Sequence, residues 1–144
     1  MDREILFRGR TIKTRFGGGK WIEGFFVISC AGRAEMEPAI ITGTEKGCFM
    51  TEFVDPATVG QFTGLCDKNG KKIFEGDIIR CIANPEVNQF ISSGTIEVMQ
   101  CDYVVVYKEK SACGFYYLHH VLMDTVEVIG NIHDNPELVK EEKQ

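Results

Sequence analysis

The residues best suited to nucleophilic chemistry are one cysteine and the histidines and aspartate that follow it. Cys113, His119 or His120, and Asp124 have the composition of a nucleophile, a general base and an orienting carboxylate. Such a set is recognised by its geometry and not by its order along the chain, and no local nucleophile signature surrounds Cys113. We therefore interpret these as ordinary surface or core residues and predict that the protein is not an enzyme.

Few residues have a spacing that suits a metal ion. His119 and His120 are adjacent, so on a strand they would point to opposite faces and could not form one site alone. Asp67, Glu75 and Asp77 lie near turns, and a Ca²⁺ site there is conceivable. The EF-hand pattern is absent, however, and turn capping is the better account. We expect no metal and no other cofactor.

The six cysteines are widely spaced along the chain. The closest pair, Cys101 and Cys113, lies 12 positions apart, so the CxxC spacing of zinc ribbons and thioredoxin-like motifs is absent. The N-terminal segment lacks the apolar stretch of a signal peptide, and no apolar run approaches the roughly 18 residues of a membrane span. We predict six free thiols, buried in a cytoplasmic protein without a membrane segment.

The net charge of −5 is unevenly distributed. Residues 1–20 hold six basic and two acidic groups, so the rest of the chain carries −9. A basic N-terminal ribbon could contact phosphates through Arg8, Arg10, Lys13, Arg15 and Lys20. The simpler interpretation is that these cations protect the edge of a sheet. The acidic remainder does not favour nucleic-acid binding.

Turn signals and apolar runs predict a mainly β protein with antiparallel strands and only short helices. The stretch Asp67–Gly70 separates two apolar runs and is typical of a hairpin connection. Residues 78–82 and 103–108 are predicted to be central strands. Helical turns are expected near 55–60 and 136–142, where a capping residue precedes a proline.

The remaining connections are predicted from the same signals. The glycines of Gly17–Gly19 precede an aromatic, strand-like segment, so they indicate a hairpin turn and not a phosphate loop. Residues 84–93 are expected to be a loop or a single helical turn. A weak boundary near residues 55–60 divides an N-terminal β-hairpin region, 1–54, from a second region, 55–144. The two are expected to pack together as one compact unit.

Several blocks of the sequence, in this order, resemble those of a known family. The blocks are Phe7–Gly9, Gly19–Gly24, Asp55–Leu65, Asp67–Lys71, Ile73–Ile79 and Val128–Ile132 with Asn135–Leu138. Together they resemble the YopX family, phage and prophage proteins of unassigned function, over nearly the whole chain. The resemblance implies a β-rich protein with an SH3-type barrel in its C-terminal part, encoded by a mobile element of a bacterial host. It supplies no catalytic residues.

Two classes of function remain open at this point. The favoured one is a non-enzymatic adaptor that binds an unidentified protein through its barrel and sheet edges, with a second copy of the chain as a further candidate partner. The alternative is a nucleic-acid-binding accessory protein. It would combine the basic ribbon with exposed aromatic rings, on which bases could stack, from Tyr103, Tyr107, Tyr116 and Tyr117.

Overall fold

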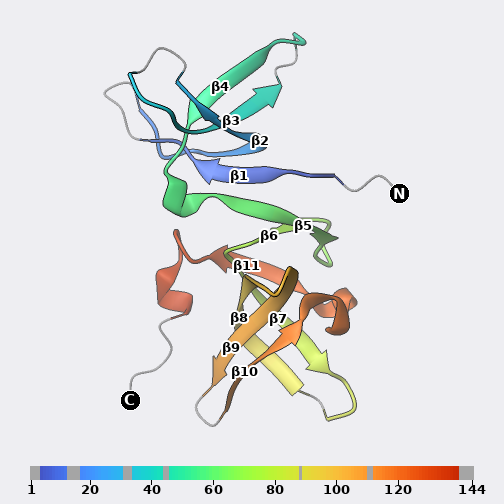
Figure 1. Ribbon diagram of the computed structural model, residues 1–144. Coiled ribbons are helices and arrows are strands. Elements are labelled where there is room, and N and C mark those ends of the chain that lie inside the picture. The colour runs from blue at the N-terminus through green and yellow to red at the C-terminus, as the bar shows by residue number, and fades with distance from the viewer. Residues whose placement is uncertain are drawn as a thin grey trace. The chain divides into compact units, whose positions relative to one another are not determined.

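The computed structural model describes residues 4–12, 17–30, 34–43, 46–87, 89–109 and 112–139. In these ranges the chain forms eleven strands and four 3₁₀ turns of three residues each (Figure 1). Neighbouring strands pair antiparallel. The prediction of a mainly β, antiparallel protein with only short helices is therefore confirmed. The described residues include no helix with the length and apolar character needed to span a membrane.

The chain forms two compact units, Met1–Phe62 and Thr63–Gln144. This division lies just after the boundary that the sequence suggested near residues 55–60. The reason is the strand β5, Gly60–Cys66, whose first residues pair with β1 before the strand continues into the second unit.

In the first unit, the strands β1 to β4 form a meander, and β5 returns to pair with β1. Its strands follow the order β4-β3-β2-β1-β5. The bounds are β1 Phe7–Arg10, β2 Trp21–Ser29, β3 Glu37–Gly43 and β4 Phe49–Phe53. The strand β2 pairs with β1 through its first half and with β3 through its second half. Gly24 stands at this change of partner, where a Cβ atom would collide with the carbonyl oxygen of Ile41.

The turn before β5 follows the predicted capping chemistry. Asp55 accepts a hydrogen bond from the backbone N–H of Ala57 at 3.0 Å, and Pro56 opens the 3₁₀ turn η1, Pro56–Thr58. The buried Thr58 hydroxyl donates to the Asp55 carbonyl at 2.6 Å and accepts the N–H of Arg10 at 2.9 Å. This hydroxyl therefore ties the turn to β1.

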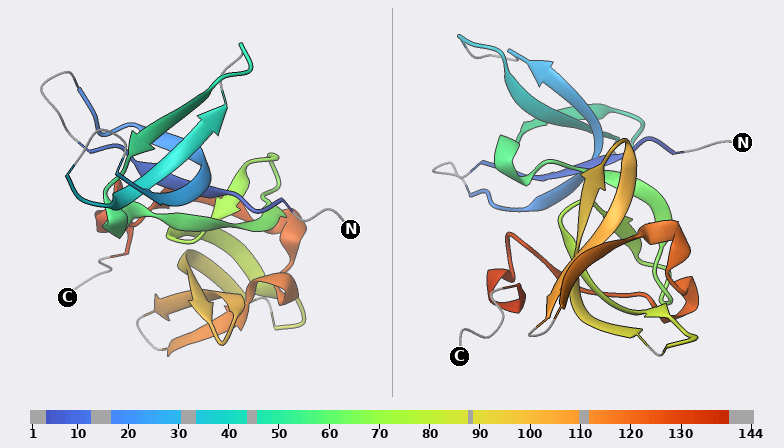
Figure 2. Two further views of the ribbon diagram at one scale, coloured as in Figure 1. Left: turned by 45° about the horizontal axis from the view of Figure 1, so that its top comes forward. Right: turned by 60° about the horizontal axis from the view of Figure 1, so that its bottom comes forward.

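The second unit is built on a five-stranded antiparallel sheet with the order β10-β9-β8-β7-β11. The short strand β6 precedes it and lies next to β5. The bounds are β6 Lys72–Phe74, β7 Asp77–Asn84, β8 Gln89–Met99, β9 Asp102–Glu109, β10 Ala112–Tyr117 and β11 Glu127–Asn131. The strands β7 and β9 each lie between two neighbours, as predicted, and the twist of the sheet can be followed in Figure 2.

The SH3-type barrel that the resemblance implied is not closed. The strand order ends at β10 and β11, which do not pair with each other in the described residues. The chain between them forms the 3₁₀ turns η2, Leu118–His120, and η3, Met123–Thr125, instead of a strand. The last 3₁₀ turn, η4, covers Pro136–Leu138.

Most strands and turns of the second unit contribute at least one side chain to its hydrophobic core. Ile79, Ile96 and Val105 are fully buried at its centre. Leu118 of η2 and Val126, the residue before β11, are buried in the same cluster. Burying side chains of this size contributes roughly 1.5–3 kcal/mol each. This apolar cluster holds the sheet that carries the groove described below.

Two expectations about the chain were wrong. Residues 84–93 were predicted to be a loop or a single helical turn. A turn does cover residues 85–87, but β8 already begins at Gln89, because Ile91 is fully buried in the core and Asn84 pairs with Gln89. The six cysteines are free as predicted, but five of them are exposed. They lie at strand ends, at turns or on exposed strand positions, and only Cys81 faces the core.

Candidate functional site

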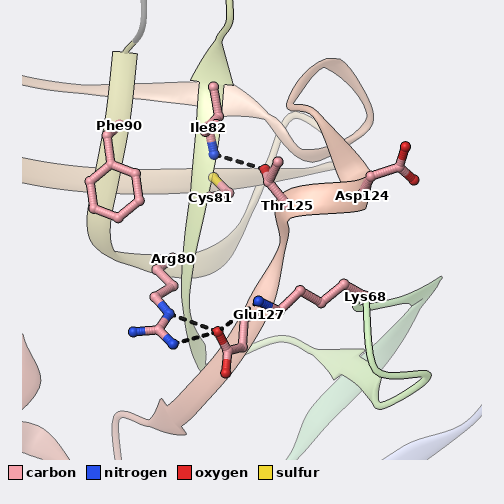
Figure 3. Close-up of a pocket in the computed structure, with 8 residues that line it drawn as sticks. All are labelled: Lys68, Arg80, Cys81, Ile82, Phe90, Asp124, Thr125 and Glu127. Carbon is pink, nitrogen blue, oxygen red and sulfur yellow. Dashed lines mark hydrogen bonds and ion pairs between the residues drawn. The ribbon is translucent and has the colours of Figure 1, made fainter.

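A groove with a volume of about 420 Å³ opens on the surface of the second unit (Figure 3). Its walls come from β7, β8 and β11, from η3, and from the turn between β5 and β6. The lining residues are Lys68, Arg80, Cys81, Ile82, Phe90, Asp124, Thr125 and Glu127. One end of the groove is apolar and the other carries an ion cluster.

The ion cluster joins two cations to one carboxylate. Arg80 and Glu127 lie directly opposite each other on β7 and β11. Arg80 contacts Glu127 Oε2 through Nε at 2.8 Å and through Nη2 at 2.6 Å, and Lys68 Nζ lies 3.2 Å from the same oxygen. The hydrogen bonds from Arg80 and then Lys68 lower the pKa of Glu127. The carboxylate is therefore ionised at neutral pH.

The turn η3, which precedes β11, extends the contacts with β7 past the first residue of β11. The Thr125 hydroxyl accepts the N–H of Ile82 at 2.9 Å and donates to the carbonyl of Leu122 at 2.6 Å. The N–H of Leu122 in turn donates to the carbonyl of Ile82 at 3.0 Å. These bonds satisfy the backbone of Ile82 and fix the wall from which Asp124 projects.

Asp67 positions the turn that carries Lys68. Its Oδ1 accepts the N–H groups of Asn69 and Lys71, both at 2.9 Å, and its Oδ2 accepts that of Val128 at 3.0 Å. Burial tends to raise the pKa of Asp67, but the three backbone N–H groups and the charge of Lys71 outweigh it, so the pKa is lowered. The ionised carboxylate thus joins the turn to β11.

Other blocks of the sequence resemblance also form backbone connections. Asp77 is buried and accepts the N–H of Phe74 at 2.8 Å, which closes the turn between β6 and β7. Gly76 has φ +88° and accepts the N–H of Ile132 at 2.9 Å. Turn capping is therefore the observed role of Asp67 and Asp77. These blocks specify the frame of the second unit.

The groove is suited to binding more than to bond-making. Its thiol, Cys81, faces the core, and burial raises its pKa to about 11, so it is protonated and a poor nucleophile at neutral pH. The hydroxyl of Thr125 is committed to two backbone bonds. Phe90, by contrast, is 53% exposed, and it lies opposite Ile82 in the register of β7 and β8.

Two of the three described cations of the predicted ribbon pack against an aromatic ring within the first unit. Arg8 is buried, and its guanidinium carbon lies 4.9 Å from the centre of the Trp21 ring. Arg10 is half-buried over the same ring at 5.3 Å, and Lys20 is exposed. Lys13 and Arg15 lie outside the described residues. Two of the five cations therefore pack on an indole within the first unit.

The candidate nucleophile set is not brought together. Cys113 lies opposite Lys108 near the start of β10, and the two histidines follow the other end of that strand. Four residues of strand separate Cys113 from Tyr117, or about 13 Å at about 3.3 Å per residue. No three His, Cys, Asp or Glu side chains in the described part of the chain are grouped so that they could hold a metal ion.

The expectation for the two histidines was wrong in its geometry. They lie on η2 and not on a strand, so their rings contact each other with centroids 4.2 Å apart. His119 Nδ1 also lies 3.8 Å from the Asp102 carboxylate. All four candidate tyrosines are half-buried, and Tyr103, Tyr107 and Tyr116 pack against the core of the second unit.

Sequence reasoning did not identify the groove residues. Arg80 and Glu127 lie 47 positions apart, and Phe90 lies in a segment predicted to be a loop or a single helical turn. One signal was present: Arg80 is the single charged residue in the apolar run of residues 78–83. A charge in such a strand marks the position that faces solvent.

Comparisons with known proteins agree with this architecture. The crystal structure of protein EF1440 from Enterococcus faecalis is similar over 96% of this chain and 100% of that chain, with a TM-score of 0.51 and 25% sequence identity. No curated protein matches the chain. The family model for the YopX protein matches residues 27–140, which is most of the sequence. The chain therefore belongs to the YopX family.

Proposed function

We propose that this YopX-family protein is a non-enzymatic adaptor that binds a segment of another protein in the groove of its second unit. The observation that carries the proposal is the pairing of an exposed apolar surface with fixed charges. Phe90 is 53% exposed beside Ile82, and the cluster of Arg80, Lys68 and Glu127 adjoins it. Apolar contact area with a few oriented polar groups is the usual composition of a binding site.

The rigidity of the groove supports this role. Its wall strand, β7, is hydrogen-bonded to β8 on one side and to β11 and η3 on the other. A partner would therefore meet a preformed surface, which lowers the entropic cost of binding. The exposed side chains of β4, in particular Phe49 and Met50, offer a second apolar surface in the first unit, for which a second copy of the chain is the candidate partner.

The nucleic-acid alternative has less support. Arg8 and Arg10 pack on Trp21, and three of the four candidate tyrosines pack against the core. From the family membership we infer that the protein is encoded by a phage or prophage and acts in the cytoplasm of the bacterial host.

The test is selection of linear heptapeptides displayed on phage against the full-length protein, followed by affinity measurement. Enriched peptides should bind the wild type and lose about tenfold or more in affinity for Phe90→Ala. The reason is that burying an exposed phenylalanine is worth about 1.5–3 kcal/mol, and 1.4 kcal/mol is about tenfold. Phe115→Ala is the matched control, because Phe115 is 45% exposed on β10, outside the groove.

Either of two outcomes would contradict the proposal. One is that no peptide is enriched. The other is that Phe90→Ala and Phe115→Ala bind the selected peptides equally well. Thermal unfolding of both variants checks that the fold is retained.

A further inference from the structure

The ion cluster in the groove presents its positive side to solvent. The side chains of Arg80 and Lys68 are 50% and 43% exposed, whereas that of Glu127 is 24% exposed. All three of their contacts converge on one oxygen, Glu127 Oε2. The two cations are therefore more accessible than the carboxylate to a group that approaches from solvent.

Asp124 is the fourth charged residue that lines the groove. It belongs to η3, on the opposite wall from Phe90, and its side chain points away from Arg80 in Figure 3. The end of the groove at Arg80 and Lys68 is thus the positive end, and an anionic group is complementary to it.

The apolar end lies at a fixed spacing from this positive end. Arg80 and Ile82 are two residues apart on β7, and Cys81 between them faces the core. Alternate residues of a strand lie on one face, about 6.6 Å apart. Phe90 lies across from Ile82 on β8. In an extended partner segment, side chains two residues apart likewise lie on one face at this spacing.

We infer that the groove binds an extended protein segment with an aspartate or glutamate two residues from an aromatic or large aliphatic side chain. The acidic side chain lies over Arg80 and Lys68, and the apolar one packs on Ile82 and Phe90. This inference rests on the proposed function, because it names the chemistry of the partner for the same groove. Glu127 then acts as the internal competitor that occupies the cations when no partner is bound.

The experiment is an NMR titration of the ¹⁵N-labelled full-length protein with end-blocked pentapeptides. The probe is Gly-Asp-Thr-Phe-Gly, and its matched control, Gly-Asn-Thr-Phe-Gly, lacks only the charge. The acidic peptide should shift the amide signals of β7, β8 and β11 and bind about tenfold more tightly than the amide, as expected when a hydrogen bond loses its charge.

Three variants test whether the ion cluster causes this difference in peptide affinity. Arg80→Gln should reduce the affinity for the acidic peptide about tenfold, and Lys108→Gln, an exposed cation on β9, should leave it unchanged. Glu127→Gln should raise the affinity several-fold, because it removes the competing carboxylate. A merely structural role of Glu127 would not produce such a gain.

The outcomes separate this inference from the proposed function. If the selected heptapeptides bind the groove but the two pentapeptides bind equally, or Arg80→Gln has no effect, the acidic specificity is wrong and the adaptor function stands. If neither the heptapeptides nor the pentapeptides bind the groove, the proposed function fails together with the inference.

Discussion

Replacing Asp67 by asparagine tests a carboxylate that joins three backbone N–H groups of the second unit. Asp67 is 7% exposed and accepts three backbone N–H groups, from Asn69, Lys71 and Val128. In Asp67→Asn, only one side-chain oxygen remains. The amide NH₂ replaces the other oxygen and faces either the N–H of Val128 or the N–H groups of the turn. At least one of these partly buried N–H groups then loses its acceptor, and the others lose a charged one.

The expected destabilisation is about 2–4 kcal/mol. An unsatisfied buried donor costs about 1–3 kcal/mol, and the loss of charge from the remaining hydrogen bonds adds about 1 kcal/mol. The three hydrogen bonds are only partly buried, so solvent places the expected value toward the lower end of this range. Urea unfolding at pH 7 measures the change in the free energy of unfolding, with Glu97→Gln, an exposed carboxylate on β8, as the charge control.

The pH dependence gives a second measurement of the same effect. Because the pKa of Asp67 is lowered in the folded state, its contribution is present above the ordinary value of 3.8 and is lost as the pH falls through the folded pKa. The difference between wild type and Asp67→Asn should therefore be largest above about pH 5 and shrink below pH 4. A difference under about 1 kcal/mol at pH 7, or one that grows in acid, would refute the reasoning.

Three further outcomes are expected. Ellman's reagent should modify the five exposed cysteines in the native protein and Cys81 only after unfolding. In denatured, unreduced protein it should count six thiols. Slow reaction of an exposed cysteine in the native protein, or a count of four, would contradict this prediction. Gln100 and Cys101 both have positive φ in the turn between β8 and β9. Replacing them by Asn-Gly should therefore raise the free energy of unfolding in urea by about 1 kcal/mol. An unchanged free energy of unfolding would show that the turn is unstrained. Duplex DNA should show no saturable binding near physiological salt; five phosphate contacts by the predicted ribbon would instead give a log–log salt slope of roughly −4.5.

Local chemistry in the sequence was sufficient to predict the strand-rich class and several turns. Asp55 followed by Pro56 predicts η1, and Asp67 to Gly70 predicts the connection between β5 and β6. These predictions succeed because capping and turn formation depend on residues within four positions of one another. The runs that became β7 and β9 are likewise predicted from their continuous β-branched and aromatic residues.

The candidate site depended on contacts that only the tertiary structure supplies. Glu127 meets Arg80 across 47 positions, and Val128 meets Asp67 across 61, because the register of β11 on β7 is set by the folded sheet. The packing of Arg8 on Trp21 follows from the pairing of β1 with β2. The charge of Arg8 is visible in the sequence, but its burial is not. Whether a side chain faces solvent, a core or a partner is decided by which strands lie beside it, and in antiparallel sheets those strands are often remote in the chain.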